Sequence, residues 1–149
     1  MNRGRRIAFD YGDVRIGVAV SDPEAILASP VSNLQSQSSD LISELRELIK
    51  EYQPIYFAIG SPSHLNGNPS AKGESVKEFC TLVRSLSELP IYLIDERLTT
   101  VSAARSLQSA GINSKAAKEK IDGAAAVAIL ESAMASEKLS GAPSKVFFP

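Results

Sequence analysis

Apolar residues at the start of the chain form short runs separated by turn residues, as in antiparallel strands. Residues 6–11 have the pattern of a buried strand, a Gly-Asp turn follows, and residues 16–21 have the pattern of a second strand. A third segment, 25–34, carries spaced apolar residues, and Pro30 within it restricts it to the edge of a sheet. The pattern predicts a three-stranded antiparallel meander.

From Asp40 onward the apolar residues recur with helical spacing, and continuous apolar runs between the helices indicate buried strands. The predicted helices cover 40–53, 70–87, 100–110 and 121–138, and the predicted strands cover 55–59 and 90–94. Strands that alternate with helices pair in parallel through right-handed crossovers. We therefore expect a single α/β domain over residues 1–149, a mixed five-stranded sheet with helices on both faces. Whether the tail, about 140–149, is flexible or folds back stays open.

The composition is that of an ordinary globular domain. The 149 residues are 44% hydrophobic and 22% charged, which excludes a disordered chain, a collagen-like repeat and a coiled coil. The single cysteine, Cys80, excludes an internal disulfide and a multi-cysteine zinc site, and its place on an apolar helix face predicts burial. No apolar run reaches the roughly 18 residues of a membrane helix. We expect a soluble, cytoplasmic protein without a signal peptide.

Three acidic residues stand at positions that are unusual for solvated surface groups. Asp10 interrupts an apolar strand, Glu96 follows a buried strand at the edge where α/β sheets bind ligands, and Asp122 precedes an alanine-rich stretch at the start of the last helix. Each has a structural alternative. Asp10 could accept hydrogen bonds from the turn that follows it. Glu96 could form an ion pair with Arg97 or Arg105. Asp122 could stabilise the positive end of the dipole of the last helix.

The predicted topology brings these three acids close together. Clustered carboxylates stay ionised only beside cations, and oxygen ligands without His or Cys favour Mg²⁺ or Mn²⁺. Such a centre suits two-metal hydrolysis of a phosphodiester, in which one ion activates water and the other stabilises the departing 3′-oxygen. Small residues after Asp122 let the last helix approach the sheet closely enough to contribute its carboxylate.

Several segments, in chain order, resemble the YqgF/RuvX family. The matching segments are 9–12, 15–22, 59–62 with 66–67, 95–100, and 120–126 with 129–131, and the resemblance extends over about residues 5–135. It implies an RNase H-like fold and a nuclease that processes pre-16S rRNA or resolves Holliday junctions. It also implies that Asp10, Glu96 and Asp122 are the catalytic, metal-binding residues. Asp95, which faces the opposite way from Glu96 if the strand continues, is a second-choice ligand. Ser61 departs from the leucine usual in the family.

The formal net charge of −1 gives no general attraction to a polyanion, so nucleic-acid binding has to rest on local basic clusters. Arg3, Arg5 and Arg6 gather near the first hairpin, and His64 is expected to have a surface role. The predicted substrate-binding residues are Arg15, Arg97, Lys118, Lys120, Gly60 and Gly67.

Three functions remain open at this point. The leading hypothesis is a metal-dependent endonuclease acting on precursor rRNA or branched DNA. A phosphotransferase is a second, because Asp10-x-Gly12 followed by Gly17 also resembles the first phosphate loop of actin-like ATPases. A third is a non-catalytic RNA-binding module for ribosome assembly. The sequence does not distinguish RNA from DNA, endo- from exonucleolytic cutting, or a monomer from a homodimer.

Overall fold

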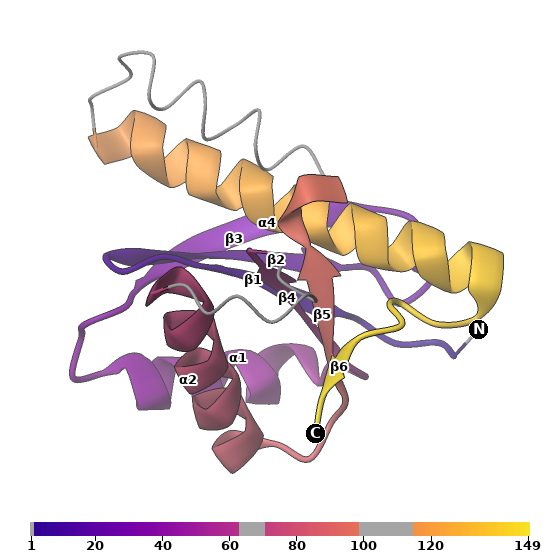
Figure 1. Ribbon diagram of the computed structural model, residues 1–149, viewed down its shortest axis with the longest axis horizontal. Helices are drawn as coiled ribbons and strands as arrows, with labels where there is room; N and C mark the ends of the chain where they lie inside the picture. The colour runs from indigo at the N-terminus through magenta and orange to yellow at the C-terminus, as the bar shows by residue number, and fades with distance from the viewer. Residues whose placement is uncertain (1, 63–70, 99–114) are drawn as a thin grey trace.

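The computed structural model describes residues 2–62, 71–98 and 115–149, and Figure 1 shows their arrangement. The strands are β1 (Ile7–Tyr11), β2 (Arg15–Ser21), β3 (Ala28–Gln35), β4 (Phe57–Ser61), β5 (Ile91–Asp95) and β6 (Phe147–Phe148). The helices are α1 (Leu41–Tyr52), α2 (Ala71–Leu86) and α4 (Lys115–Ser140), with a 3₁₀ turn over Glu96–Leu98. The helix predicted over 100–110 lies outside the described residues.

The strands form one mixed sheet in the order β3-β2-β1-β4-β5-β6. Strands β1, β2 and β3 pair antiparallel, whereas β1, β4 and β5 pair in parallel, which confirms the predicted combination. Pro30 lies in β3, at the edge of the sheet, as predicted. The predicted count of five strands was wrong, because the tail folds back and Phe147 and Phe148 pair with β5. A strand of two residues is too short to produce a periodic pattern.

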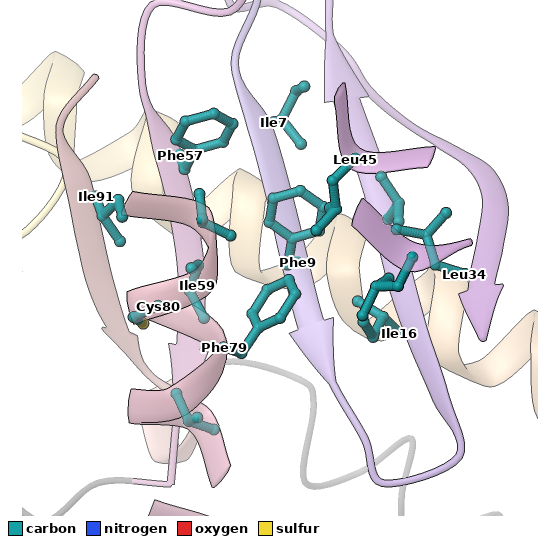
Figure 2. Packing of buried hydrophobic residues seen from close by; sticks show 14 of the residues in the cluster. Ile7, Phe9, Ile16, Leu34, Leu45, Phe57, Ile59, Phe79, Cys80 and Ile91 are labelled. Atoms are coloured by element: carbon teal, nitrogen blue, oxygen red, sulfur yellow. The ribbon is translucent and has the colours of Figure 1, made fainter. Parts of the chain in front are cut away.

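Helices α1 and α2 cover one face of the sheet, and α4 crosses the other (Figure 1). The face under α1 and α2 is filled by large side chains, among which the rings of Phe9, Phe57 and Phe79 pack together (Figure 2). Cys80 belongs to this core, and burial raises the pKa of its thiol to about 12, so the predicted burial is confirmed.

The core under α4 is built largely from alanine, and this allows the helix to lie close to the sheet. It is formed by Ala8, Ala19 and Ala58 from the strands and by Ala125, Ala126 and Ala133 from the helix, all buried. The helix begins at Lys115, so the expected start near residue 121 was wrong. Asp122 therefore lies about two turns inside the helix, and the structural alternative that placed it at the positive end of the helix dipole does not apply. No helix among the described residues is long and apolar enough to cross a membrane.

Arg6 was expected in a basic surface cluster, but it is completely buried. Its Nη2 lies 2.8 Å from Oε2 of Glu137 on α4, and the hydroxyl of Tyr56 donates a hydrogen bond of 2.9 Å to Oε1 of the same carboxylate. Burial by itself lowers the pKa of Arg6, but the hydrogen bond and charge of Glu137 outweigh it and raise that pKa overall. The guanidinium keeps its charge and ties the end of α4 to the sheet.

Candidate active site

Asp10 lies in β1 with a glycine beside it on each neighbouring strand. It is buried and pairs with Gly17 of β2. The parallel register that pairs Phe9 with Ile59 places Gly60 of β4 next to it on the other side. Side chains alternate along a strand, and Ala8 belongs to the core under α4, so Asp10 points toward α4 as well. Because neither glycine carries a side chain, other elements can come close to the sheet on both sides of Asp10.

Asp122 is brought to this place by close contact between α4 and β2. A Cβ atom added to Gly17 would stand 2.1 Å from the carbonyl oxygen of Asp122, so only glycine allows this approach. Arg15 of β2 donates a hydrogen bond of 3.0 Å from Nε to Oδ2 of Asp122, and both side chains are largely buried. The predicted substrate-binding residue Arg15 thus contacts one of the predicted acids.

Glu96 begins the 3₁₀ turn that follows β5, and its side chain folds back over β4. A Cβ atom on Gly60 would be 3.0 Å from Oε1 of Glu96. Lys72 of α2 places its Nζ 3.8 Å from Oε2 of Glu96. Arg97, which the sequence offered as a partner for Glu96, pairs instead with Asp95 at 3.0 Å, and that hydrogen bond raises the pKa of Arg97.

The three predicted acids therefore follow one another across β2, β1 and β4 on the α4 side of the sheet. They form a row, and we call Asp122, Asp10 and Glu96 the carboxylate row. Within residues 2–62, 71–98 and 115–149, no group of three His, Cys, Asp or Glu side chains stands close enough to hold a metal ion. The oxygen-only donors suit Mg²⁺ or Mn²⁺. The residues fit such an ion by the chemistry of their donors, although among the described residues they do not stand together as a formed metal site.

The other predicted binding residues are only partly described. Arg97 is exposed and Gly60 lies under Glu96, as given above. Two of the predicted residues, His64 and Gly67, lie outside the described residues. The side chains of Lys118 and Lys120 are not described either. Sequence reasoning missed Lys72, because no motif surrounds it and its contact with Glu96 depends on how α2 packs.

A comparison with models of protein families shows which family the chain belongs to. The RuvX family, described as Holliday junction resolvase, matches residues 4–136. This chain belongs to the RuvX family. The resemblance that the sequence motifs indicated is therefore confirmed.

Curated relatives agree with the RuvX assignment over nearly the whole chain. A relative from Streptomyces coelicolor is 43% identical over 145 residues, covering 96% of this chain and 87% of its own. Another from Streptomyces avermitilis is 43% identical over 143 residues, covering 95% and 92%. Both carry the name "Putative pre-16S rRNA nuclease".

Among solved structures, Thermus thermophilus RuvC in complex with a Holliday junction substrate has the same fold as this RuvX chain. The two align with a TM-score of 0.62 over 97% of this chain and 99% of the other, at 16% identity. At 16% identity, this structural similarity is evidence for a shared fold and not for a shared activity. The predicted RNase H-like fold is confirmed.

The close approach of α4 at Gly17 can be tested by adding one methyl group. Gly17→Ala should lower the free energy of unfolding by about 1–3 kcal/mol, because the new Cβ meets backbone that has little room to move. Gly123→Ala is the control: its Cβ meets only Pro30 Cβ at 3.3 Å, and the gain in helix propensity of up to about 1 kcal/mol offsets that contact. Urea unfolding measures both. Equal stability of Gly17→Ala and wild type would contradict the described packing.

Proposed function

We propose that this chain is a divalent-metal-dependent nuclease that hydrolyses phosphodiester bonds of structured nucleic acid, and that its substrate is the 5′ end of pre-16S rRNA. The observation that carries the proposal is the carboxylate row, three acids from distant parts of the chain placed over neighbouring strands, two of them beside glycines that make room for them. Membership of the RuvX family and the names of the relatives support it. We further propose an endonuclease that acts in the cytoplasm.

In this proposal Asp10, Glu96 and Asp122 hold Mg²⁺ or Mn²⁺, and Asp95 is the second choice. When bound, the ions supply an activated water and neutralise charge on the phosphate. Asp10 contributes a carboxylate fixed by the central strand, so it needs little reorganisation when substrate binds. Glu96 and Asp122 approach it from opposite sides.

Basic side chains next to the carboxylate row serve the polyanionic substrate. Arg15 contacts Asp122 at one end of the row, and Lys72 contacts Glu96 at the other. Arg97, which is exposed, follows Glu96 directly in the chain. Together with Lys118, Lys120, Gly60 and Gly67 they form the proposed binding set. Because such contacts release counterions from the nucleic acid, substrate affinity should fall steeply as salt rises.

Holliday junction resolution is the second candidate, favoured by the description of the family and by the fold shared with RuvC. Cutting two strands of a junction symmetrically requires a two-fold dimer, whereas processing one end of an rRNA can be done by a monomer. Sedimentation of the purified chain, with and without a four-way junction, distinguishes these two states.

The deciding experiment offers both substrates to the same preparation. A transcript spanning the 5′ end of 16S rRNA and a four-way DNA junction are incubated with Mg²⁺, Mn²⁺ or EDTA. We expect cleavage of the transcript with either metal and none with EDTA. Cleavage of the junction alone would favour the second candidate. Tight RNA binding that EDTA leaves unchanged, without any cleavage, would replace both with a non-catalytic assembly module.

A further inference from the structure

A pocket of about 300 Å³ opens beside the carboxylate row, between β5, α4 and the tail. Ser61 and Asp95, the last residues of β4 and β5, line its end nearest the row. Ser61 follows Gly60, which Glu96 covers, and Asp95 precedes Glu96 in the chain. Two residues of the pocket wall are therefore chain neighbours of Gly60 and Glu96, which places the pocket next to the Glu96 end of the row.

The walls of the pocket are held in place by hydrogen bonds of the tail. The hydroxyl of Ser144 donates to the carbonyl of Leu93 at 2.8 Å, and the backbone NH of Leu93 donates to the carbonyl of Val146 at 2.9 Å. The hydroxyl of Ser136 on α4 donates to the carbonyl of Ala142 at 2.8 Å. These hydrogen bonds join the tail to β5 and to α4, so the walls are already in place without a ligand, as in most ligand pockets.

Besides the carboxylate of Asp95, which pairs with Arg97 at 3.0 Å, the lining combines three kinds of groups. Leu93, Pro143 and Val146 give apolar surface, Ser132 adds a hydroxyl from α4, and Lys145 adds an exposed ammonium group. A ligand with apolar flat faces, hydrogen-bonding edges and an attached anion matches this combination, and a nucleotide has all three. The volume is at the lower end of the range for ligand pockets, which suits a single ring system.

We propose that this pocket receives one unpaired nucleotide of the substrate strand, with its base between the apolar walls and its phosphate toward Lys145. The inference rests on the proposed function and deepens it, because it requires an unpaired nucleotide next to the cleaved bond. A base inside a continuous duplex is held by pairing and stacking and does not enter such a pocket, whereas bases in loops, bulges and single strands can be splayed out. The substrate class is therefore nucleic acid with an unpaired nucleotide at the cutting site.

Binding is tested on the full chain without metal. Amide shifts of ¹⁵N-labelled protein are followed during titration with adenosine 5′-monophosphate to millimolar concentration, and ribose 5-phosphate is the control that lacks a base. We expect shifts at Leu93, Ser132 and Val146 with the nucleotide and clearly smaller ones with ribose 5-phosphate. Equal shifts with both compounds, or shifts confined to other regions, would overturn the proposal.

A filled pocket gives the second readout. Ser132→Leu places a larger side chain in the pocket, and Ala135→Leu, on the exposed side of the same helix, is the matched control. Ser132→Leu should weaken nucleotide binding and cleavage of unpaired substrate by about tenfold or more, because the leucine side chain occupies space that the base needs. Lys145→Gln, at an exposed position, should weaken binding without affecting the fold. Full activity of both variants would contradict the pocket.

The two proposals fail in different ways. If the wild-type protein binds the nucleotide in this pocket but cleaves neither the transcript nor the junction, the nuclease proposal is wrong. If the wild-type protein cleaves fully paired and unpaired substrates equally, and the amide signals of the pocket residues do not shift, the nuclease proposal holds and the proposed nucleotide pocket is wrong. Asp10→Asn should keep the nucleotide shifts while losing cleavage.

Discussion

Asp10→Asn should reduce cleavage by at least about a thousandfold, equivalent to about 4 kcal/mol of lost transition-state stabilisation, the scale expected when a metal ligand loses its charge. Asparagine has nearly the same shape, so the strand and its neighbours should stay in place. The quantity to measure is kcat/KM on the cleaved substrate at fixed Mn²⁺, with circular dichroism to verify the fold.

Asp13→Asn is the matched control for this substitution, because Asp13 lies in the same hairpin but is exposed. It should cleave at the wild-type rate. If Asp10→Asn were as active as Asp13→Asn, Asp10 would have no role in the reaction, and the carboxylate row would lose its central member.

Arg6→Ala should lower the free energy of unfolding by about 3–5 kcal/mol, because it leaves the carboxylate of Glu137 buried without its cation. Arg3→Ala is the control: the pair of Arg3 with Glu24 is exposed to solvent, and its loss should cost less than about 1 kcal/mol. Urea unfolding monitored by circular dichroism gives both values. Similar stabilities for the two variants would mean that the buried pair does not secure α4.

The succession of strands and helices and the unusual positions of Asp10 and Glu96 were predictable, because they depend on local patterns. Asp10 stands out in an apolar strand, and Glu96 is placed at the carboxyl edge of the sheet by the strand before it. When β1 lies at the centre of the sheet, the tight turn to β2 places β2 on one side of it, and the crossover through α1 places β4 on the other. The glycines beside Asp10 then explain how Asp122 and Glu96 come close to the neighbouring strands β2 and β4.

The remaining features depend on contacts between distant residues, which a sequence pattern does not record. Arg6 was expected at the surface because its partner, Glu137, is 131 residues away along the chain. The start of α4 was missed because the residues before Ile121 are mostly polar and alanine, so no apolar face marks the first turns. Lys72 reaches Glu96 only through the packing of α2.

A crystal of the protein with Mn²⁺ and a phosphorothioate-protected nucleic acid tests the central claim most directly. Manganese is located by its anomalous scattering. The account predicts manganese between the carboxylates of Asp10, Glu96 and Asp122, with a backbone phosphate against it. Manganese bound elsewhere beside the phosphate, while Asp122 and Glu96 remain with Arg15 and Lys72, would contradict it.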